Sequence, residues 1–178
     1  MFRETFSVDR DTTYLGSTVK GMADSGSMPV VIIKDPKHRR QENGKAYRFG
    51  VCFDTSRHSQ KTLRTVCSMM HDHDKLVTIT VTDHDLDHSK VEKQIDEITA
   101  EFKIKAEHVL LDKGEAPNVY TRVSQYLNDE STEENYVDFV GIGNRGIHAR
   151  PTDRATLGSM AENLVHDRRI NVIFVPCE

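Results

Sequence analysis

The stretch FVGIGNRGIHARPTDRATLGSMAENLVHDRRINVIFVP, residues 139–176, decides the fold of this chain. It holds an apolar run, a glycine turn at Gly143 and Gly146, a Gly158-Ser159 pair, an amphipathic segment and a second apolar run. Glycine has no Cβ, so the amides of the turn can approach a bulky anion closely. The Gly158-Ser159 pair opens a predicted helix, whose dipole favours negative charge. The stretch therefore predicts strand, turn, helix and strand around a two-part phosphate cradle.

Strand and helix signals continue to alternate upstream as far as residue 47. Runs rich in β-branched residues predict five strands, and apolar residues at intervals of three and four predict the helices between them. The expected strands are Tyr47–Asp54, Leu76–Thr82, His108–Leu111, Tyr136–Ile142 and Ile170–Val175. This alternation predicts an α/β fold, a doubly wound parallel five-stranded sheet with helices on both faces.

Two local signals suggest where helices begin. Ser89 and Glu92 have the spacing of a capping box, which predicts the start of the second helix. Pro117 precedes the apolar stripe of the third helix, and we expect it near the first turn.

The stretch resembles the universal stress protein family, whose nucleotide-binding members carry Gly-x2-Gly-x9-Gly-Ser/Thr here. In this chain the pattern is Gly143-x2-Gly146-x11-Gly158-Ser159, so the second interval is longer by two residues. The resemblance extends over about residues 47–176, and its first strand ends in Asp54-Thr55-Ser56 where the family typically has Asp-Gly-Ser. It implies the strand order 3-2-1-4-5. In that order the winding reverses between strands 1 and 4, where doubly wound sheets bind ligands.

The resemblance implies a bound adenine nucleotide, ATP or a related one, which Mg²⁺ could accompany through the phosphates. By position, Asp54 would contact the ribose and Val81 would meet the adenine through its backbone. Gly143 would lie close to the ribose. The phosphates would be held by Gly146, Gly158, Ser159 and the amide of Met160.

Several of these residues have structural alternatives. Asp54 after a strand is also typical of a turn or helix-capping carboxylate, and the side chain of Met160 suits core packing. Arg145, Arg150 and Arg154 could neutralise phosphate charge or lie in a solvated loop.

Three classes of function compete. The first is an adenine-nucleotide-binding regulatory protein of the stress response, which would act through other proteins. The second is a related interaction scaffold that binds no nucleotide, favoured by the longer interval between Gly146 and Gly158. An enzyme is less well supported, at most a slow incidental ATP hydrolase, because no nucleophile–base pair and no P-loop occurs. No Gly-x-Gly-x-x-Gly follows the first strand, which argues against a flavin or dinucleotide protein.

Composition narrows the partners. The 178 residues carry a net charge of −4, so the overall balance implies no basic face for nucleic acid. No apolar run approaches the roughly 18 residues of a membrane span, and the first ten residues lack a signal-peptide core. The three cysteines lack metal-ligand spacing, and the His-Asp clusters at 71–73 and 83–88 favour solvated turns over a metal. We therefore expect a soluble cytoplasmic protein without a metal site.

The front of the chain repeats its end. Residues 15–34 parallel residues 157–176 at a constant offset of 142 (157 − 15), and Val30–Ile33 matches Val172–Val175. We therefore expect a partial repeat over 1–34, made of one helix and one strand, a linker over 35–46 and a universal stress protein-like domain over 47–178. The resemblance implies that strand 5 is an edge strand, because subunits of the family often associate through it. Residues 30–34 are predicted to pair antiparallel with 171–175, within the chain as a pseudo-dimer or across a homodimer.

Overall fold

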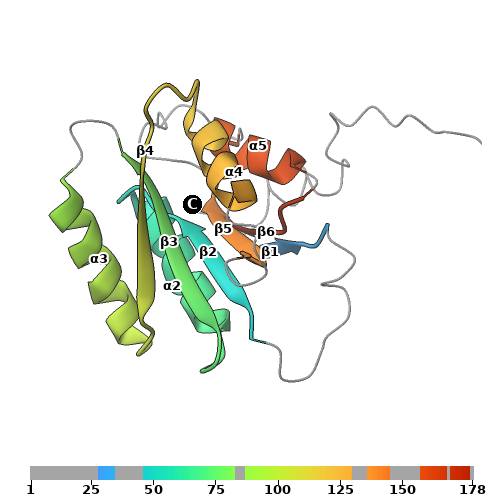
Figure 1. Ribbon diagram of the computed structural model, residues 1–178. Coiled ribbons are helices and arrows are strands. Elements are labelled where there is room, and N and C mark those ends of the chain that lie inside the picture. Colours follow the sequence, from blue (N-terminus) through green and yellow to red (C-terminus); the bar gives the residue numbers. More distant parts are fainter. Residues whose placement is uncertain are drawn as a thin grey trace, which may run out of the picture.

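A computed structural model describes residues 28–34, 46–82, 87–129, 136–144, 157–167 and 169–176. Within these ranges the chain forms one six-stranded sheet flanked by helices (Figure 1). The strands are β1 (Val30–Ile32), β2 (Arg48–Cys52), β3 (Lys75–Thr82), β4 (Ala106–Asp112), β5 (Phe139–Gly143) and β6 (Val172–Val175). The helices are α2 (Arg57–Met69), α3 (His88–Glu101), α4 (Val119–Asp129) and α5 (Ser159–His166). None of these described helices has both the length and the apolar character needed to cross a bilayer.

The sheet runs in the order β1-β6-β5-β2-β3-β4. The strands β6, β5, β2, β3 and β4 pair with their neighbours in parallel, and β1 pairs antiparallel with β6. The five parallel strands predicted from the sequence are therefore confirmed as β2 to β6. Numbered in chain order as strands 1 to 5, they lie as 3-2-1-4-5, with the winding reversed between β2 and β5.

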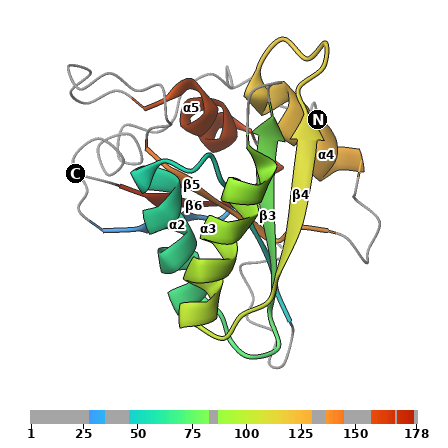
Figure 2. The same cartoon turned by 90° about the vertical axis from the view of Figure 1, so that its left-hand side faces the viewer.

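Helices cover both faces of the sheet. On one face lie α2 and α3 (Figure 2). They pack on a cluster of buried side chains from β2, β3 and β6, which includes Phe49, Val51 and Ile173. On the other face α4 and α5 cover clusters that include Val140 and Leu164. The central strands are buried on both sides, which explains why they read as apolar runs rather than alternating ones.

The capping box predicted at Ser89 is wrong. Helix α3 begins at His88, two residues earlier than a cap at Ser89 implies, and its N-cap is Asp87, whose carboxylate accepts from the amides of Ser89 and Lys90. The Ser89 hydroxyl donates to the same carboxylate at 2.7 Å, and Ser89 itself is the second residue of the helix. An ionised carboxylate is the stronger acceptor, so the aspartate two residues upstream takes the capping position.

Element ends also differ from the sequence prediction by a few residues. Strand β4 extends over Ala106–Asp112 because it pairs with β3 along seven residues, more than its short apolar run suggested. Helix α4 starts after Pro117, and the side chain of Asn118 accepts from the amide of Thr121 at 2.8 Å.

The strand predicted near the N-terminus is present. β1 pairs antiparallel with β6 within the same chain, through Val30↔Phe174 and Ile32↔Val172. The helix expected to precede it, with Gly16 and Ser17, lies outside the described residues, as do residues 35–45 of the expected linker.

Candidate functional site

The carboxyl ends of β2 and β5 meet where the sheet reverses its winding. β2 pairs with β3 on one side and with β5 on the other, both in parallel. Since Cys52 is opposite Ile79, continuing the register by two residues brings Asp54 level with Val81 of β3. On the other side Val51 is opposite Gly141, and continuing that register by three residues brings Asp54 level with Asn144, directly after Gly143. Residues implied for ribose, adenine and phosphate thus share one edge of the sheet.

Asp54 forms the turn that leads from β2 into α2. Its Oδ1 accepts from the amide of Ser56 at 3.1 Å and from the Ser56 hydroxyl at 2.5 Å. Ser56 is the N-cap of α2 and its Oγ accepts from the amide of Ser59. The alternative interpretation of Asp54 as a turn carboxylate is therefore confirmed. A carboxylate has about four acceptor positions, and the two bonds from Ser56 both fall on Oδ1.

Thr55 adopts a left-handed backbone conformation, with φ of 65°. Glycine enters this region freely, whereas a β-branched residue does so only at a cost. The family to which the sequence was compared typically has glycine here, and the structure supplies the physical reason. The tight turn after β2 survives the substitution, with backbone strain at its centre.

Val81 directs its backbone polar groups toward the reversal point. The carbonyl of Ile79 faces β2, because it accepts from the amide of Phe53 at 2.9 Å. The carbonyl of Thr82 faces the other way and accepts from the amide of Lys113 near the end of β4. Orientation alternates along a strand, so Val81 faces the β2 side, where β2 has already ended. One N–H and one C=O are thus presented beside Asp54.

Helix α5 starts at the end of β5. The amide of Gly158 donates to the carbonyl of Asn144 at 2.8 Å, across the interval that is longer than in the family pattern. The first bond within α5 runs from Glu162 to the carbonyl of Gly158, and no side chain caps the helix. The amides of Ser159, Met160 and the next residue therefore lie before the first helical bond, where a helix terminus attracts anions. Asn144 was missed by sequence reasoning, since a backbone carbonyl leaves no residue-type signal.

Gly143 has a packing role that the sequence did not reveal. A Cβ placed on Gly143 would lie 3.1 Å from Cβ of His58 and 3.3 Å from Oγ1 of Thr62, both on α2. Gly141 is tighter, with Cγ2 of Val66 at 2.8 Å. Both glycines let α2 approach β5, so bulk added at Gly143 meets α2 and does not report on a ligand alone.

The other residues that the resemblance implies for the site lie in the core, at the start of α5 or outside the described residues. The Met160 side chain packs against the apolar clusters under α4 and α5, as expected for a core residue. Ser159 is exposed at the helix start. Gly146 and the three arginines at 145, 150 and 154 lie outside the described residues.

The Cys52 thiol next to this edge is a poor nucleophile. Burial, and then the charge of Asp54, raises the pKa of the Cys52 thiol to about 12, so it stays protonated at neutral pH. Among the described residues no group of three or more His, Cys, Asp or Glu side chains is arranged to hold a metal ion.

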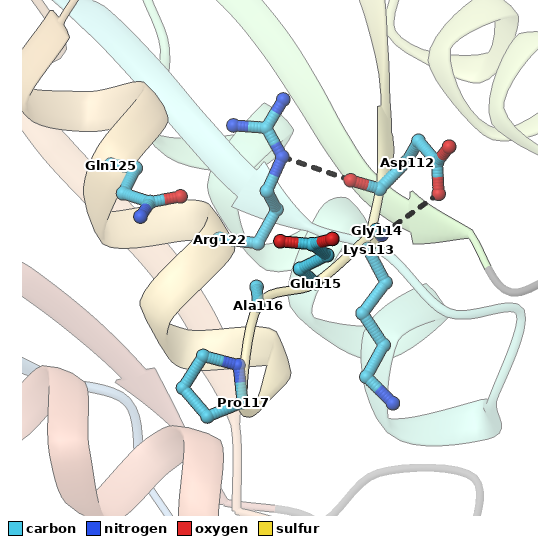
Figure 3. Close-up of a pocket in the computed structure, with 8 residues that line it drawn as sticks. All are labelled: Asp112, Lys113, Gly114, Glu115, Ala116, Pro117, Arg122 and Gln125. Carbon is cyan, nitrogen blue, oxygen red and sulfur yellow. Dashed lines mark hydrogen bonds between the residues drawn. The ribbon is translucent and has the colours of Figure 1, made fainter.

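A surface pocket of about 450 Å³ lies at the same end of the sheet, between the end of β4 and α4 (Figure 3). Its wall is held by Arg122, whose Nε donates to the carbonyl of Asp112, and by Gly114, whose amide donates to the Asp112 carboxylate. Asp112 is paired with Thr82, the neighbour of Val81. The pocket contains none of the residues implied by the resemblance.

No protein-family model matches the sequence, and comparison with curated proteins gives no match. Solved structures do match. A universal stress protein from Archaeoglobus fulgidus has 16% sequence identity and a TM-score of 0.57, over 74% of this chain and 99% of its own. A second, from Archaeoglobus fulgidus DSM 4304, has 18% identity and a TM-score of 0.61, over 88% of this chain and 52% of its own. A universal stress protein solved in complex with cAMP has 16% identity and a TM-score of 0.55, over 74% of this chain and 98% of its own.

These matches define the class of protein by its architecture, a doubly wound α/β domain. More particularly, the chain has the universal stress protein fold. The fold expected from the glycine stretch and from the strand–helix alternation is confirmed.

Proposed function

We propose that this protein binds an adenine nucleotide at the β2–β5 reversal point and acts as a regulatory protein of the universal stress protein type. The observation that carries the proposal is the hydrogen bond from Gly158 to Asn144, which holds the start of α5 against the end of β5. Without that contact the two halves of the phosphate cradle would be separate loops. The cAMP complex of one structural neighbour supports an adenine ligand for this fold.

The proposed ligand lies along the edge from β3 to α5. The N–H and C=O of Val81 complement the acceptor and donor on the Watson–Crick edge of adenine. The Asp54 carboxylate accepts from a ribose hydroxyl. The phosphates accept hydrogen bonds from the amides at the start of α5 and from the hydroxyl of Ser159, at the positive end of the helix dipole. Gly143 and Gly158 would allow close backbone approach, as the resemblance implies for Gly146 too, and Mg²⁺ would arrive with the phosphates rather than in a protein cage.

The direct test is calorimetric titration of the full chain with ATP, ADP, AMP, cAMP, adenosine and GTP. We expect adenine nucleotides to bind and GTP to bind at least about tenfold more weakly, because guanine reverses the donor and acceptor that Val81 faces. Equal binding of ATP and GTP would contradict the assignment of the adenine position. Native mass spectrometry of the purified protein gives a second readout, since a retained nucleotide adds a discrete mass.

The second candidate is an interaction scaffold that binds no nucleotide. The eleven-residue interval after Gly146 and the threonine in place of glycine at position 55 favour it. No heat and no added mass with any of the six ligands would contradict the first proposal and leave the scaffold as the candidate function.

A further inference from the structure

The pairing of β1 with β6 has an internal two-fold symmetry. The sequence repeat makes Val30, Val31 and Ile32 equivalent to Val172, Ile173 and Phe174, at the offset of 142. In the sheet Val31 is opposite Ile173, its own equivalent, while Val30 is opposite Phe174 and Ile32 is opposite Val172. Each strand therefore presents to the other the same three positions in reverse. This is the relation between two copies of one strand across a symmetric dimer interface.

Backbone orientation agrees with this symmetry. The carbonyl of Asn171 faces β5, because it accepts from the amide of Val140 at 2.9 Å. By alternation Val172 and Phe174 direct their backbone groups toward β1, and Ile173 directs its groups toward β5. Val31 and Ile173 therefore form a non-hydrogen-bonded pair, the kind in which facing side chains come closest.

The hydrogen bonds of Lys34, two residues after β1, depart from this symmetry. The Lys34 ammonium donates to the carbonyls of Leu164 and Asp167 at the end of α5, at 2.7 and 2.5 Å. The Lys34 amide donates to Oδ1 of Asn171 at 2.8 Å. The residue equivalent to Lys34 in the repeat is Pro176, which has neither an ammonium nor an amide hydrogen. A second β6 on this edge could make none of these three bonds.

We propose that β1 is an internal substitute for the β6 strand of a second copy of this chain, and that it keeps the β6 edge from pairing with that copy. The self-symmetric register makes β6 complementary to another β6, with Ile173 on the two-fold axis. Lys34 gives β1 the advantage, and attachment to the same chain adds an effective concentration in the millimolar range. Displacing β1 therefore uncovers an edge whose partner is the β6 strand of an identical chain.

The test introduces cysteines into the full chain with Cys177 replaced by serine. The thiols of Cys52 and Cys67 are protected, because burial raises their pKa values to about 12 and about 11. With Val31→Cys and Ile173→Cys together, we expect a disulfide within one chain, which leaves the monomer mass on a non-reducing gel. A cross-linked dimer from this pair would mean that β1 is exchanged between chains, and would overturn the proposal.

The second arm displaces β1. Ile32→Pro removes an amide that faces β6, whereas Val31→Pro, the matched control, removes one that faces outward. In the Ile173→Cys background, we expect Ile32→Pro to yield a disulfide dimer and a sedimentation coefficient that rises with concentration. The Val31→Pro control should stay monomeric. Lys34→Met should shift the balance in the same direction as Ile32→Pro, to a smaller extent.

Two results would refute the proposal. One is an Ile32→Pro variant that stays monomeric, or aggregates, without a disulfide that joins the cysteines introduced by Ile173→Cys in two chains. The other is a disulfide dimer from Ile173→Cys with β1 unaltered, because the edge would then be open to a second copy already.

Discussion

Thr55 carries a backbone strain that a single substitution can relieve. Its φ of 65° lies in the left-handed region, although its neighbours Asp54 and Ser56 hold the turn by hydrogen bonds. The turn is thus maintained by the cap of α2 against the preference of the residue at its centre.

Thr55→Gly should stabilise the protein by about 1 kcal/mol. Relief of left-handed strain contributes about 1–2 kcal/mol for a residue with a Cβ, and the extra freedom of glycine in the unfolded chain removes about 0.5–1 kcal/mol. Urea unfolding is the measurement, with a raised midpoint and an unchanged m-value expected. A lower midpoint would mean that the Thr55 side chain makes a contact worth more than the strain.

Ser159→Asp should separate helix stability from phosphate binding. A carboxylate in the first turn of α5 suits the helix dipole and should add about 0.5 kcal/mol to stability. The same charge repels phosphate, so the affinity for ATP should fall at least about tenfold. Adenosine, which has no phosphate, should bind with unchanged affinity.

The matched control is Ser159→Asn, which has nearly the same shape as the aspartate variant without the charge and should retain most of the ATP affinity. Calorimetry gives the affinities and thermal unfolding gives the stability. ATP binding that is equally strong in Ser159→Asp and in the unaltered protein would remove α5 from the proposed site.

At the scale of the element, helices α2 and α5 each depend on a close backbone approach. Helix α2 lies over β5 because Gly141 and Gly143 have no Cβ on the side that faces it. Helix α5 is fastened at both ends, by the Gly158–Asn144 bond at its start and by the Lys34 ammonium at its end. A side chain added at Gly141 tests the packing of α2 on β5. Deprotonation of Lys34 tests the contact at the end of α5.

Gly141→Ala should destabilise the protein by about 1–3 kcal/mol, because its methyl group would lie 2.8 Å from Cγ2 of Val66. Val66→Ala opens space at that point and should reduce the cost of the Gly141→Ala change. A double-mutant cycle by urea unfolding measures this coupling, which we expect to be favourable in the double variant. Strictly additive effects would show that α2 shifts as a whole instead.

Lys34 should make stability depend on alkaline pH. Burial lowers the pKa of its ammonium from 10.5 to about 8, and the Asp167 carboxylate opposes that shift. Between these two values the unfolded chain binds a proton that the folded chain does not, so the free energy of unfolding rises with pH. Because Lys34 is partly exposed, we expect a gain of about 1–2 kcal/mol over this range. A neutral amine still has two N–H donors for its two carbonyl partners.

The measurement is urea unfolding from pH 7 to 10.5 for the unaltered protein and for Lys34→Met. Their difference isolates Lys34 from neighbours that also titrate or carry charge: Tyr120, which donates to Asp167 at 2.9 Å, and Arg169, which pairs with the same carboxylate at 3.1 Å. A difference that stays constant with pH would contradict the lowered pKa.

At the scale of the whole molecule, the sheet has two edges of different origin. β4 closes one side as an ordinary parallel strand, and β1 closes the other as an antiparallel strand from the front of the chain. The outward side chains of β1 and its extension, Val31 and Ile33, remain 41% and 37% exposed. Strand β1 thus covers the edge of β6, and the exposed apolar side chains lie on β1 and its extension instead.

The sequence by itself determined the elements of the protein and their type. β-branched runs and apolar stripes are local patterns, so they identified the five parallel strands and the helices between them, and the offset of 142 pointed to β1. The order of the strands followed from the resemblance, since local periodicity carries no information about which strand lies beside which. Of the proposed site, Asp54 and Gly158 were reached through the resemblance, from their positions after the first strand and at the start of the last helix.

Only the tertiary structure decided how these elements meet. The carbonyl of Asn144, the close packing of α2 on Gly143 and the bonds from Lys34 to α5 all join parts of the chain that are distant in sequence. The sequence gives no signal for the role of a backbone carbonyl or for a close contact at a glycine. A lysine is expected at the surface, and its bonds to a helix end appear only in the folded structure. Hydrophobic periodicity selects which face is buried, whereas close packing selects the neighbour, and that choice exists only once the chain has folded.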